Sequence, residues 1–193
     1  MQFIVYAESV NISSQPMAVR KAKPRKTSAR LTHLDSRGRI RMVDVGEKPV
    51  TRREAVARGK IRMASATLAA IVGGKLKKGE ALSAARLAGI MAAKRTHELI
   101  PLCHQLPLEV VSVDFRPDGK RSILEIEARA VTQARTGVEM EALVAVSTAA
   151  LVIYDMAKAI DRAMEIGAIR LVTKRGGRSG EFTRPGESAW PSR

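Results

Sequence analysis

Two short segments of this chain carry side chains that could transfer protons. The first, Pro101-Leu102-Cys103-His104, places a thiol beside an imidazole. The second, Tyr154-Asp155-Met156-Ala157-Lys158, places a carboxylate and an amine three residues apart. The ordinary pKa values of these four groups span most of the range that general acid–base catalysis uses. The two segments together therefore predict an acid–base site.

Each segment also has a simpler interpretation. Asp155 and Lys158 share a face of a predicted helix, and most pairs with this spacing are surface ion pairs that contribute little. Here the flanking residues 151–153, 156 and 157 are all apolar or aliphatic, which indicates a packed helix. Cys103 and His104 follow a proline in an irregular segment, where functional residues are common, although a single Cys or His more often fills the core.

Two basic, glycine-containing segments could bind phosphate. Residues 174–180, Lys-Arg-Gly-Gly-Arg-Ser-Gly, combine three cations with glycines that let backbone N–H groups approach an anion. Residues 75–79, Lys-Leu-Lys-Lys-Gly, precede a predicted helix whose N-terminus adds positive potential. Either segment alone could be an ordinary exposed loop. Two of them in one small domain favour a polyphosphate ligand.

Composition limits the class of protein. The 193 residues carry a net charge of +15, of which residues 1–30 contribute +5 through six Lys or Arg against Glu8. Such charge favours an anionic partner, namely nucleic acid, an acidic membrane surface or a polyphosphate, but it also serves solubility. Aromatic residues make up only 3%, which disfavours single-stranded nucleic-acid binding by stacking. The single cysteine suits the reducing cytoplasm, and no uncharged apolar run approaches the roughly 18 residues of a membrane span.

A metal site is not expected. The chain has three histidines, and neither they nor Cys103 occur with the spacing of a zinc motif.

Periodicity and turn residues predict the elements that position these groups. Residues 1–30 are expected to be a disordered basic extension, residues 31–184 a single domain, and residues 185–193 a loose tail. We expect strands at 53–63, 108–115, 123–128 and 169–174, with a hairpin turn at 117–119. We expect helices at 65–71 with Ser65 as a cap, at 79–95, and from a capping box at Thr136–Glu139 to about Met164. This order predicts an α+β sandwich, in which helices cover one face of an antiparallel sheet.

A set of longer motifs identifies a family. In chain order they are Leu31-Thr32-His33, Met42-Val43-Asp44-Val45, Ala93-Lys94-Arg95-Thr96, Leu99-Ile100-Pro101-Leu102-Cys103-His104, Thr136-Gly137-Val138-Glu139-Met140-Glu141-Ala142-Leu143, Ile153-Tyr154-Asp155-Met156 and Lys174-x-Gly-Gly-x-Ser-Gly180. With these motifs, residues 31–182 closely resemble the cyclic pyranopterin monophosphate synthase family of molybdenum cofactor biosynthesis. The resemblance implies a ferredoxin-like fold and a lyase-type reaction. In that reaction 3′,8-cyclo-7,8-dihydro-GTP becomes cyclic pyranopterin monophosphate and releases diphosphate, without a redox cofactor.

The resemblance also implies roles for individual residues. It matches Asp155 and Lys158 to a catalytic pair that moves protons. Because a carboxylate raises the pKa of a neighbouring lysine, we expect burial and cations such as Lys174 to lower the pKa of Lys158 again. Glu139 or Glu141 suits the N–H edge of a guanine-type base. The positions matched to substrate binding are Leu102, Cys103, His104, Glu139, Met140, Glu141, Arg53, Lys78 and Lys174, the last three cations being suited to the triphosphate.

Further expectations follow from the family. Its members assemble as hexamers built from dimers, with residues of two subunits in each active site, so a homohexamer is expected here. No membrane attachment and no dedicated nucleic-acid binding are expected. A magnesium ion could neutralise the departing diphosphate, but no ligand motif in the sequence demands one.

Two other interpretations remain open at this stage. The charge would suit a basic nucleic-acid-binding module, although the chain lacks an aromatic nucleic-acid motif and its candidate cations lie among Asp155, Glu139 and Glu141. A non-catalytic oligomeric scaffold could retain the same fold. The presence together of Cys103, His104, Asp155, Lys158 and Lys174 disfavours it, because loss of function would not preserve all five.

Overall fold

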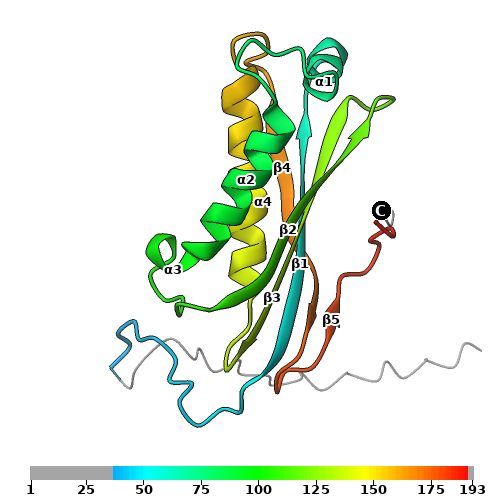
Figure 1. The fold of residues 1–193 in the computed structure, drawn as a ribbon. Coiled ribbons are helices and arrows are strands. Elements are labelled where there is room, and N and C mark those ends of the chain that lie inside the picture. Colours follow the sequence, from blue (N-terminus) through cyan, green and yellow to red (C-terminus); the bar gives the residue numbers. More distant parts are fainter. Residues whose placement is uncertain (1–36, 191–193) are drawn as a thin grey trace, which may run out of the picture. The chain divides into compact units, whose positions relative to one another are not determined.

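The computed structural model describes residues 37–190, which form one antiparallel sheet with helices on one face (Figure 1). The strands are β1 (Thr51–Arg62), β2 (Leu108–Asp118), β3 (Ile123–Ala134), β4 (Glu165–Arg175) and β5 (Phe182–Thr183). The helices are α1 (Ser65–Val72), α2 (Ala81–Lys94), α3 (Thr96–Leu99) and α4 (Glu139–Ala157). The predicted extension at residues 1–30 and the Leu31-Thr32-His33 motif lie outside the described residues.

The sheet has the strand order β2-β3-β1-β4-β5, and every neighbouring pair is antiparallel. Helices α2 and α4 connect the first four strands and pack side by side on the same face of the sheet (Figure 1). This is the connectivity of a ferredoxin-like sandwich with one short strand added at the β4 edge. The predicted α+β class, with helices on one face, is therefore confirmed.

Small residues set the distance between the two layers. The inward positions of β1 include Ala55 and Ala57, both fully buried, and α4 presents Ala145 and Ala149 to α2. A Cβ atom added to Gly89 of α2 would lie 2.8 Å from the carbonyl oxygen of Ala145, so the two helix backbones are in close contact. The small residues of α4 thus allow the backbone of α2 to approach closely within this chain.

Strand 53–63 and the hairpin of β2 and β3 are confirmed, but the predicted end of the longest helix is wrong. Helix α4 stops at Ala157 rather than near Met164, and residues 165–175 form β4, where Gly167 lies opposite Lys60. The carboxylate of Asp161 accepts hydrogen bonds from the N–H groups of Ala64 (2.9 Å) and Ala163 (3.0 Å). One bond is local and the other reaches the residue before α1, and together they hold the segment after α4 in a non-helical path.

The predicted helix caps and the hairpin turn also need correction. The N-cap of α4 is Val138 and that of α1 is Ala64, and neither makes a side-chain cap, so Thr136 and Ser65 do not have the expected roles. The turn between β2 and β3 spans residues 119–122, two residues beyond the predicted position, with Ser122 at a φ of 53°.

Among the described residues, α4 alone is long and apolar enough to cross a membrane by length and composition. Half of its most apolar window is buried against α2 and the sheet. The core helix of a soluble protein passes the same test, so this feature carries no argument for a membrane.

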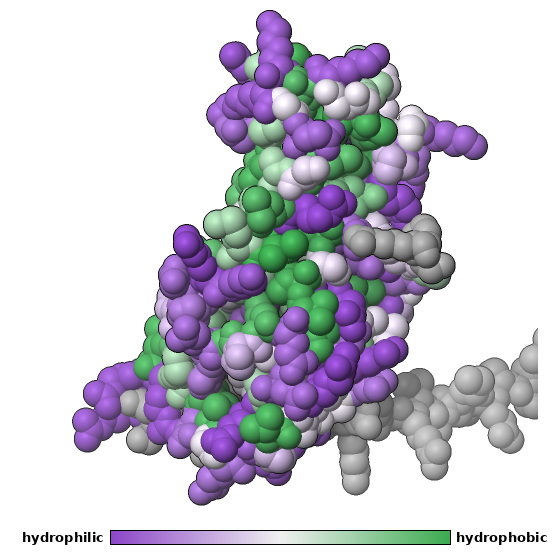
Figure 2. Space-filling model, viewed as in Figure 1, coloured by the Kyte–Doolittle hydropathy of each residue, from purple (hydrophilic) through white to green (hydrophobic). Residues whose placement is uncertain are grey.

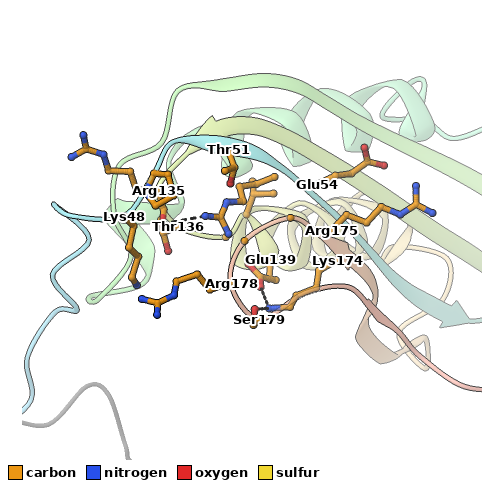
Figure 3. Close-up of a pocket in the computed structure, with 16 residues that line it drawn as sticks. Lys48, Thr51, Glu54, Arg135, Thr136, Glu139, Lys174, Arg175, Arg178 and Ser179 are labelled. Atoms are coloured by element: carbon orange, nitrogen blue, oxygen red, sulfur yellow. Dashed lines mark hydrogen bonds and ion pairs between the residues drawn. The ribbon is translucent and has the colours of Figure 1, made fainter.

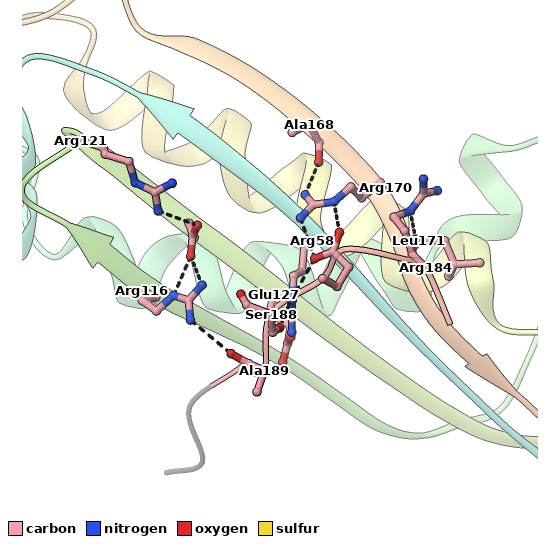
Figure 4. A network of polar contacts seen from close by, with 12 residues as sticks. Arg58, Arg116, Arg121, Glu127, Ala168, Arg170, Leu171, Arg184, Ser188 and Ala189 are labelled. Carbon is pink, nitrogen blue, oxygen red and sulfur yellow. Dashed lines mark hydrogen bonds and ion pairs between the residues drawn. The ribbon is translucent and has the colours of Figure 1, made fainter. Parts of the chain in front are cut away.

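Residues 187–190, here called the C-terminal strap, contact the sheet face that the helices leave open (Figure 4). Glu187 forms ion pairs with Arg58 (3.0 Å) and with Arg170. The ring of Trp190 lies under the guanidinium groups of Arg116 (4.7 Å) and Arg58 (5.2 Å). The sequence predicts a loose tail from residue 185, but the C-terminal strap is held by these contacts.

Replacing Glu187 by glutamine is expected to lower the free energy of unfolding by about 1–2 kcal/mol at pH 7, because Arg170 loses its carboxylate partner and Arg58 keeps only Glu127. Arg170 and then Arg58 hold the pKa of Glu187 below its ordinary value of 4.5. The contribution is therefore present above that value and is lost as the pH falls through the lowered pKa. Urea titrations should show wild type and variant converging in acid, whereas Glu181→Gln, at an exposed site, should match wild type throughout.

Candidate active site

Three charged residues meet at the C-terminal end of α4, and we call them the acid–base cluster. Asp155 lies in the last turn of α4 and Lys158 is its C-cap residue. The loop between α1 and α2 brings Lys78 to the same place. The Oδ1 atom of Asp155 lies 2.7 Å from Lys158 Nζ and its Oδ2 atom 2.9 Å from Lys78 Nζ. Lys78 also donates to the backbone carbonyl of Asp155 at 3.0 Å, so the carboxylate is fixed between two ammonium groups.

The electrostatics of this cluster favour the charged forms. Hydrogen bonds from Lys158 and then Lys78 lower the pKa of Asp155 to about 2. The same contact with Asp155 raises the pKa of Lys158. The expected lowering by burial and by Lys174 is therefore not found in the single chain, where Lys158 is half exposed and its neighbouring cation is Lys78. In this state Lys158 is an ammonium that can give a proton, and Asp155 is a carboxylate that holds it.

A second group of residues lines a cavity of about 720 Å³ near the N-terminal end of α4 (Figure 3). We call it the cationic pocket, because its lining includes Lys48, Arg53, Arg135, Lys174 and Arg178. Thr51 also lines it, and the Thr51 hydroxyl is buried with no hydrogen-bond partner among the described residues. A concave site rich in cations and holding an unsatisfied hydroxyl suits a polar, anionic ligand.

Lys174 is oriented by two acceptors from different elements. Its Nζ atom lies 3.1 Å from Glu139 Oε1 in the first turn of α4, and it donates to the Ser179 hydroxyl at 2.9 Å (Figure 3). Glu139 is thus engaged with a cation of the same chain, which the sequence did not predict. In this state one carboxylate oxygen of Glu139 pairs with Lys174, so the carboxylate is not fully available to accept hydrogen bonds from the N–H edge of a guanine-type base.

Arg53 is held rigidly at the back of the pocket. Its side chain comes from β1, is nearly buried, and donates to the carbonyl oxygens of Ala134 (3.3 Å) and Arg135 (3.5 Å). The loop after β4 passes over it at Gly177, which has a φ of +86°. A Cβ atom at Gly177 would lie only 1.5 Å from Arg53 Nη1, so glycine is required for the guanidinium to stay where it is.

The Gly177→Ala variant is expected to fold but to bind a triphosphate ligand at least about tenfold more weakly, because its methyl group displaces the guanidinium of Arg53. Isothermal titration with inorganic triphosphate would measure this. Gly180→Ala is the matched control, since Gly180 also has a positive φ of +70° but its added Cβ atom meets nothing within 4 Å. Equal losses in both variants would assign the effect to backbone strain and not to Arg53.

Glu141, in the first turn of α4, lies close enough to Cys103, between α3 and β2, for the two side chains to interact electrostatically. Glu141 is 4% exposed, and burial raises its pKa to about 7, with the charge of Glu139 as a smaller cause. Burial also raises the pKa of the Cys103 thiol, and the charge of Glu141 adds to this. Cys103 is therefore a neutral thiol at pH 7 and not an activated nucleophile.

The remaining predicted residues lie on neighbouring elements. Leu102 and His104 are half-buried in the segment between α3 and β2, and Met140 is half-buried in the first turn of α4. They flank Cys103 and Glu141 in sequence, at the same end of α4 as the cationic pocket.

The structure divides the predicted site into two parts. Arg53, Glu139 and Lys174 lie together in the cationic pocket, whereas Asp155 and Lys158 lie in the acid–base cluster. Glu139 and Asp155 are sixteen residues apart on one straight helix, which corresponds to about 24 Å along its axis. Lys78, expected to bind phosphate with Arg53 and Lys174, lies at the acid–base cluster instead. One chain therefore does not place all the predicted residues around a single point.

Sequence reasoning missed two cations of the pocket, Lys48 and Arg135. Lys48 belongs to the irregular segment before β1, where a hydrogen bond from its N–H group to Val45 (3.0 Å) closes a turn. Arg135 follows β3 and donates to the carbonyl oxygen of Gly46 (2.8 Å). Neither residue has a local pattern that marks it, because both are placed by pairing of β1 with β3. Ser179 stood within a quoted motif, but its contact with Lys174 could not be read from spacing.

Within residues 37–190 the structure contains no group of three or more His, Cys, Asp or Glu side chains arranged to hold a metal ion.

Comparison with known proteins is consistent with this arrangement. The model of the MoaC family matches residues 42–177, which is more than half of the chain. A protein of Pelotomaculum thermopropionicum named cyclic pyranopterin monophosphate synthase is 64% identical over 160 residues, covering 83% of this chain and 94% of that relative. Proteins of the same name from Chloroflexus aurantiacus (64% identity, 80% and 95% coverage) and Thermomicrobium roseum (58% identity, 83% and 97% coverage) are similar over the same extent. The chain therefore belongs to the MoaC family.

Proposed function

We propose that this chain is a cyclic pyranopterin monophosphate synthase of molybdenum cofactor biosynthesis, which converts 3′,8-cyclo-7,8-dihydro-GTP into cyclic pyranopterin monophosphate and diphosphate. The observation that carries the proposal is 64% identity across 94% of a relative with that name. The geometry adds two features that the reaction requires: a cationic pocket for a polyphosphate and a carboxylate–ammonium cluster for proton transfer.

In the proposed reaction the cationic pocket holds the triphosphate and then the departing diphosphate. Arg53 is suited to a bidentate contact with phosphate oxygens, and Lys174 acts as a point charge beside it. Lys48, Arg135 and Arg178 line the same cavity and add to the positive field. Concentrating these charges stabilises negative charge as it builds up on the leaving group.

The acid–base cluster would supply the protons for ring opening and ring closure. Lys158, held as an ammonium by Asp155, donates a proton to the nitrogen that departs when the five-membered ring opens. The resulting amine is then placed to take a proton from the group that condenses with the carbonyl. Asp155 and Lys78 keep the Lys158 side chain oriented, and the Asp155 carboxylate favours reprotonation of the Lys158 amine.

We further propose that each active site is formed by two chains of a homohexamer. Proton transfer requires contact over about 3 Å, whereas the two halves of the site are about 24 Å apart on α4. A second chain that brings its acid–base cluster to the cationic pocket of the first would complete the site. Leu87 and Met91 of α2 and Leu151 of α4 are about half or more exposed, and Figure 2 shows an apolar band on this helical face that a second chain could cover.

The other interpretations have weaker support. A nucleic-acid module would present an unbroken basic surface, but Glu139 occupies the cationic pocket and Asp155 lies between Lys78 and Lys158. A scaffold would have no use for these arrangements. The proposal includes no redox cofactor and a cytoplasmic location, which suits a chain whose single cysteine cannot form an internal disulfide. No ligand motif demands magnesium; a magnesium ion that took part would accompany the diphosphate, and comparison of turnover with and without a chelator would test it.

The decisive experiment incubates the purified protein with enzymatically prepared 3′,8-cyclo-7,8-dihydro-GTP. Cyclic pyranopterin monophosphate and diphosphate are quantified together. Equal formation of both, lost in Asp155→Ala, is expected. Absence of both products from a folded oligomer would reject the proposed function and direct attention to DNA and RNA binding.

A further inference from the structure

The loop between β4 and β5 holds a serine to which the reaction described above gives no role. We propose that Ser179 is a positioning residue that fixes the ammonium group of Lys174 for phosphate binding in the cationic pocket. The inference rests on the proposed function, because it concerns how the same pocket receives the triphosphate. Its direct evidence is the 2.9 Å hydrogen bond from Lys174 Nζ to Ser179 Oγ (Figure 3).

The loop is shaped so that Ser179 returns to Lys174. Gly176 and Gly177 both have positive φ angles, 89° and 86°, and the N–H group of Gly180 bonds to the carbonyl oxygen of Gly177 at 3.1 Å. A Cβ atom on Gly176 would lie 2.1 Å from the carbonyl oxygen of Arg52, so only glycine permits this path. The reversal brings a hydroxyl five residues further along the chain back to the lysine that precedes the loop.

The number of donors on Lys174 shows what the serine contributes. An ammonium group has three N–H donors. One donates to Ser179 (2.9 Å), and the ion pair with Glu139 (3.1 Å) draws the ammonium group toward α4, so at least one donor remains for a ligand in the pocket. Glu139 alone would leave the ammonium free to rotate and would offset its charge. Because Ser179 is neutral, it fixes the direction of the remaining donors without reducing the attraction for phosphate.

Two acceptors on different elements also limit where Lys174 can go. Glu139 begins α4 and Ser179 belongs to the loop before β5, so the ammonium is held from two sides of the pocket. Ser179 itself is exposed, and a threonine can therefore place its hydroxyl in the same position with its methyl group in solvent. This makes a rescue experiment available.

The test compares Ser179→Ala, Ser179→Thr and the matched control Ser147→Ala. Ser147 is a half-buried serine of α4 whose hydroxyl makes one hydrogen bond, to Leu143 (2.8 Å), away from both halves of the site. We expect Ser179→Ala to raise KM about tenfold while kcat changes by less than about twofold. Ser179→Thr should restore KM, and Ser147→Ala should match wild type. Calorimetry with inorganic diphosphate should show the same loss of affinity in Ser179→Ala alone.

Other outcomes would overturn the inference. An unchanged KM and an unchanged diphosphate affinity in Ser179→Ala would show that Lys174 does not need the serine. A reduced melting temperature with losses in both kcat and KM, not rescued by threonine, would show a structural role only. If wild type makes no product, the proposed function fails, but diphosphate binding by the same variants still decides the role of Ser179.

Discussion

Replacing Lys158 by alanine is expected to lower kcat by about 100- to 10,000-fold, the range typical for loss of a positioned acid or base. Lys158 is the ammonium held 2.7 Å from Asp155, and its raised pKa keeps the transferable proton in place at neutral pH. No other described lysine contacts Asp155 apart from Lys78, which is directed to the second carboxylate oxygen and to the backbone carbonyl. Lys78 is therefore badly placed to substitute for it.

Single-turnover kinetics would measure this effect and separate chemistry from binding. Inorganic diphosphate should lose much less affinity for Lys158→Ala than for Lys174→Ala, because the cations that line the pocket, including Arg53 and Lys174, remain in place. Lys120→Ala, which removes an exposed lysine from the turn between β2 and β3, is the control for loss of positive charge. A Lys158→Ala enzyme with full turnover would remove Lys158 from the mechanism, and Lys78 would become the candidate proton donor.

The sheet and the helices that cover it could be predicted from the sequence because their hydrophobic patterns are local. The two runs that form the hairpin place β2 and β3, and the helices on one face follow from the order of the elements. The segment 53–63 alternates only weakly and its Ala, Arg and Glu content also suits a helix, so β1 is predicted on a narrower basis. The ends of α4 were not predictable in the same way. The Thr136–Glu139 spacing suggested a capping box, but Glu139 instead turns to Lys174 of β4, a partner 35 residues away. Asp161 ends the helix by bonding to Ala64, which is 97 residues away.

For the candidate site too, the sequence indicates which residues matter but not where the fold places all of them. The motifs identified which residue types matter, because Asp155 and Lys158 are neighbours on a helix whatever the rest of the fold does. The contact of Lys78 with Asp155 and the enclosure of Arg53 by Gly177 depend on loops that meet only in the folded chain. For this reason the sequence placed Lys78 with Arg53 and Lys174 at the triphosphate. The structure places it with Asp155, at the other end of α4.

Mixing two inactive variants is expected to restore activity if each site is shared between chains. In Lys158→Ala the acid–base cluster is defective, and in Lys174→Ala the cationic pocket is defective. A dimer with one chain of each kind has one site built from two defective halves and one site built from two intact halves. Random pairing makes half of the dimers mixed, and one of the two sites in each mixed dimer is intact. About a quarter of wild-type turnover is therefore expected. The two variants would be co-expressed with different tags, allowed to assemble at random and purified together.

This experiment separates the two possible arrangements of the site. If one chain carried a complete site, every site in the mixture would contain one of the two substitutions, and turnover would stay at the level of the parent variants. The separation of about 24 Å between Glu139 and Asp155 excludes direct proton transfer from Lys158 to a ligand bound beside Lys174 in the same rigid chain. Assays with substrate well below the KM of Lys174→Ala give the clearest contrast, because that variant is expected to be defective in binding. Co-expressing Lys158→Ala with Asp155→Ala is the control. Both substitutions lie in the acid–base cluster, so every site would still contain a defective cluster and no activity should return.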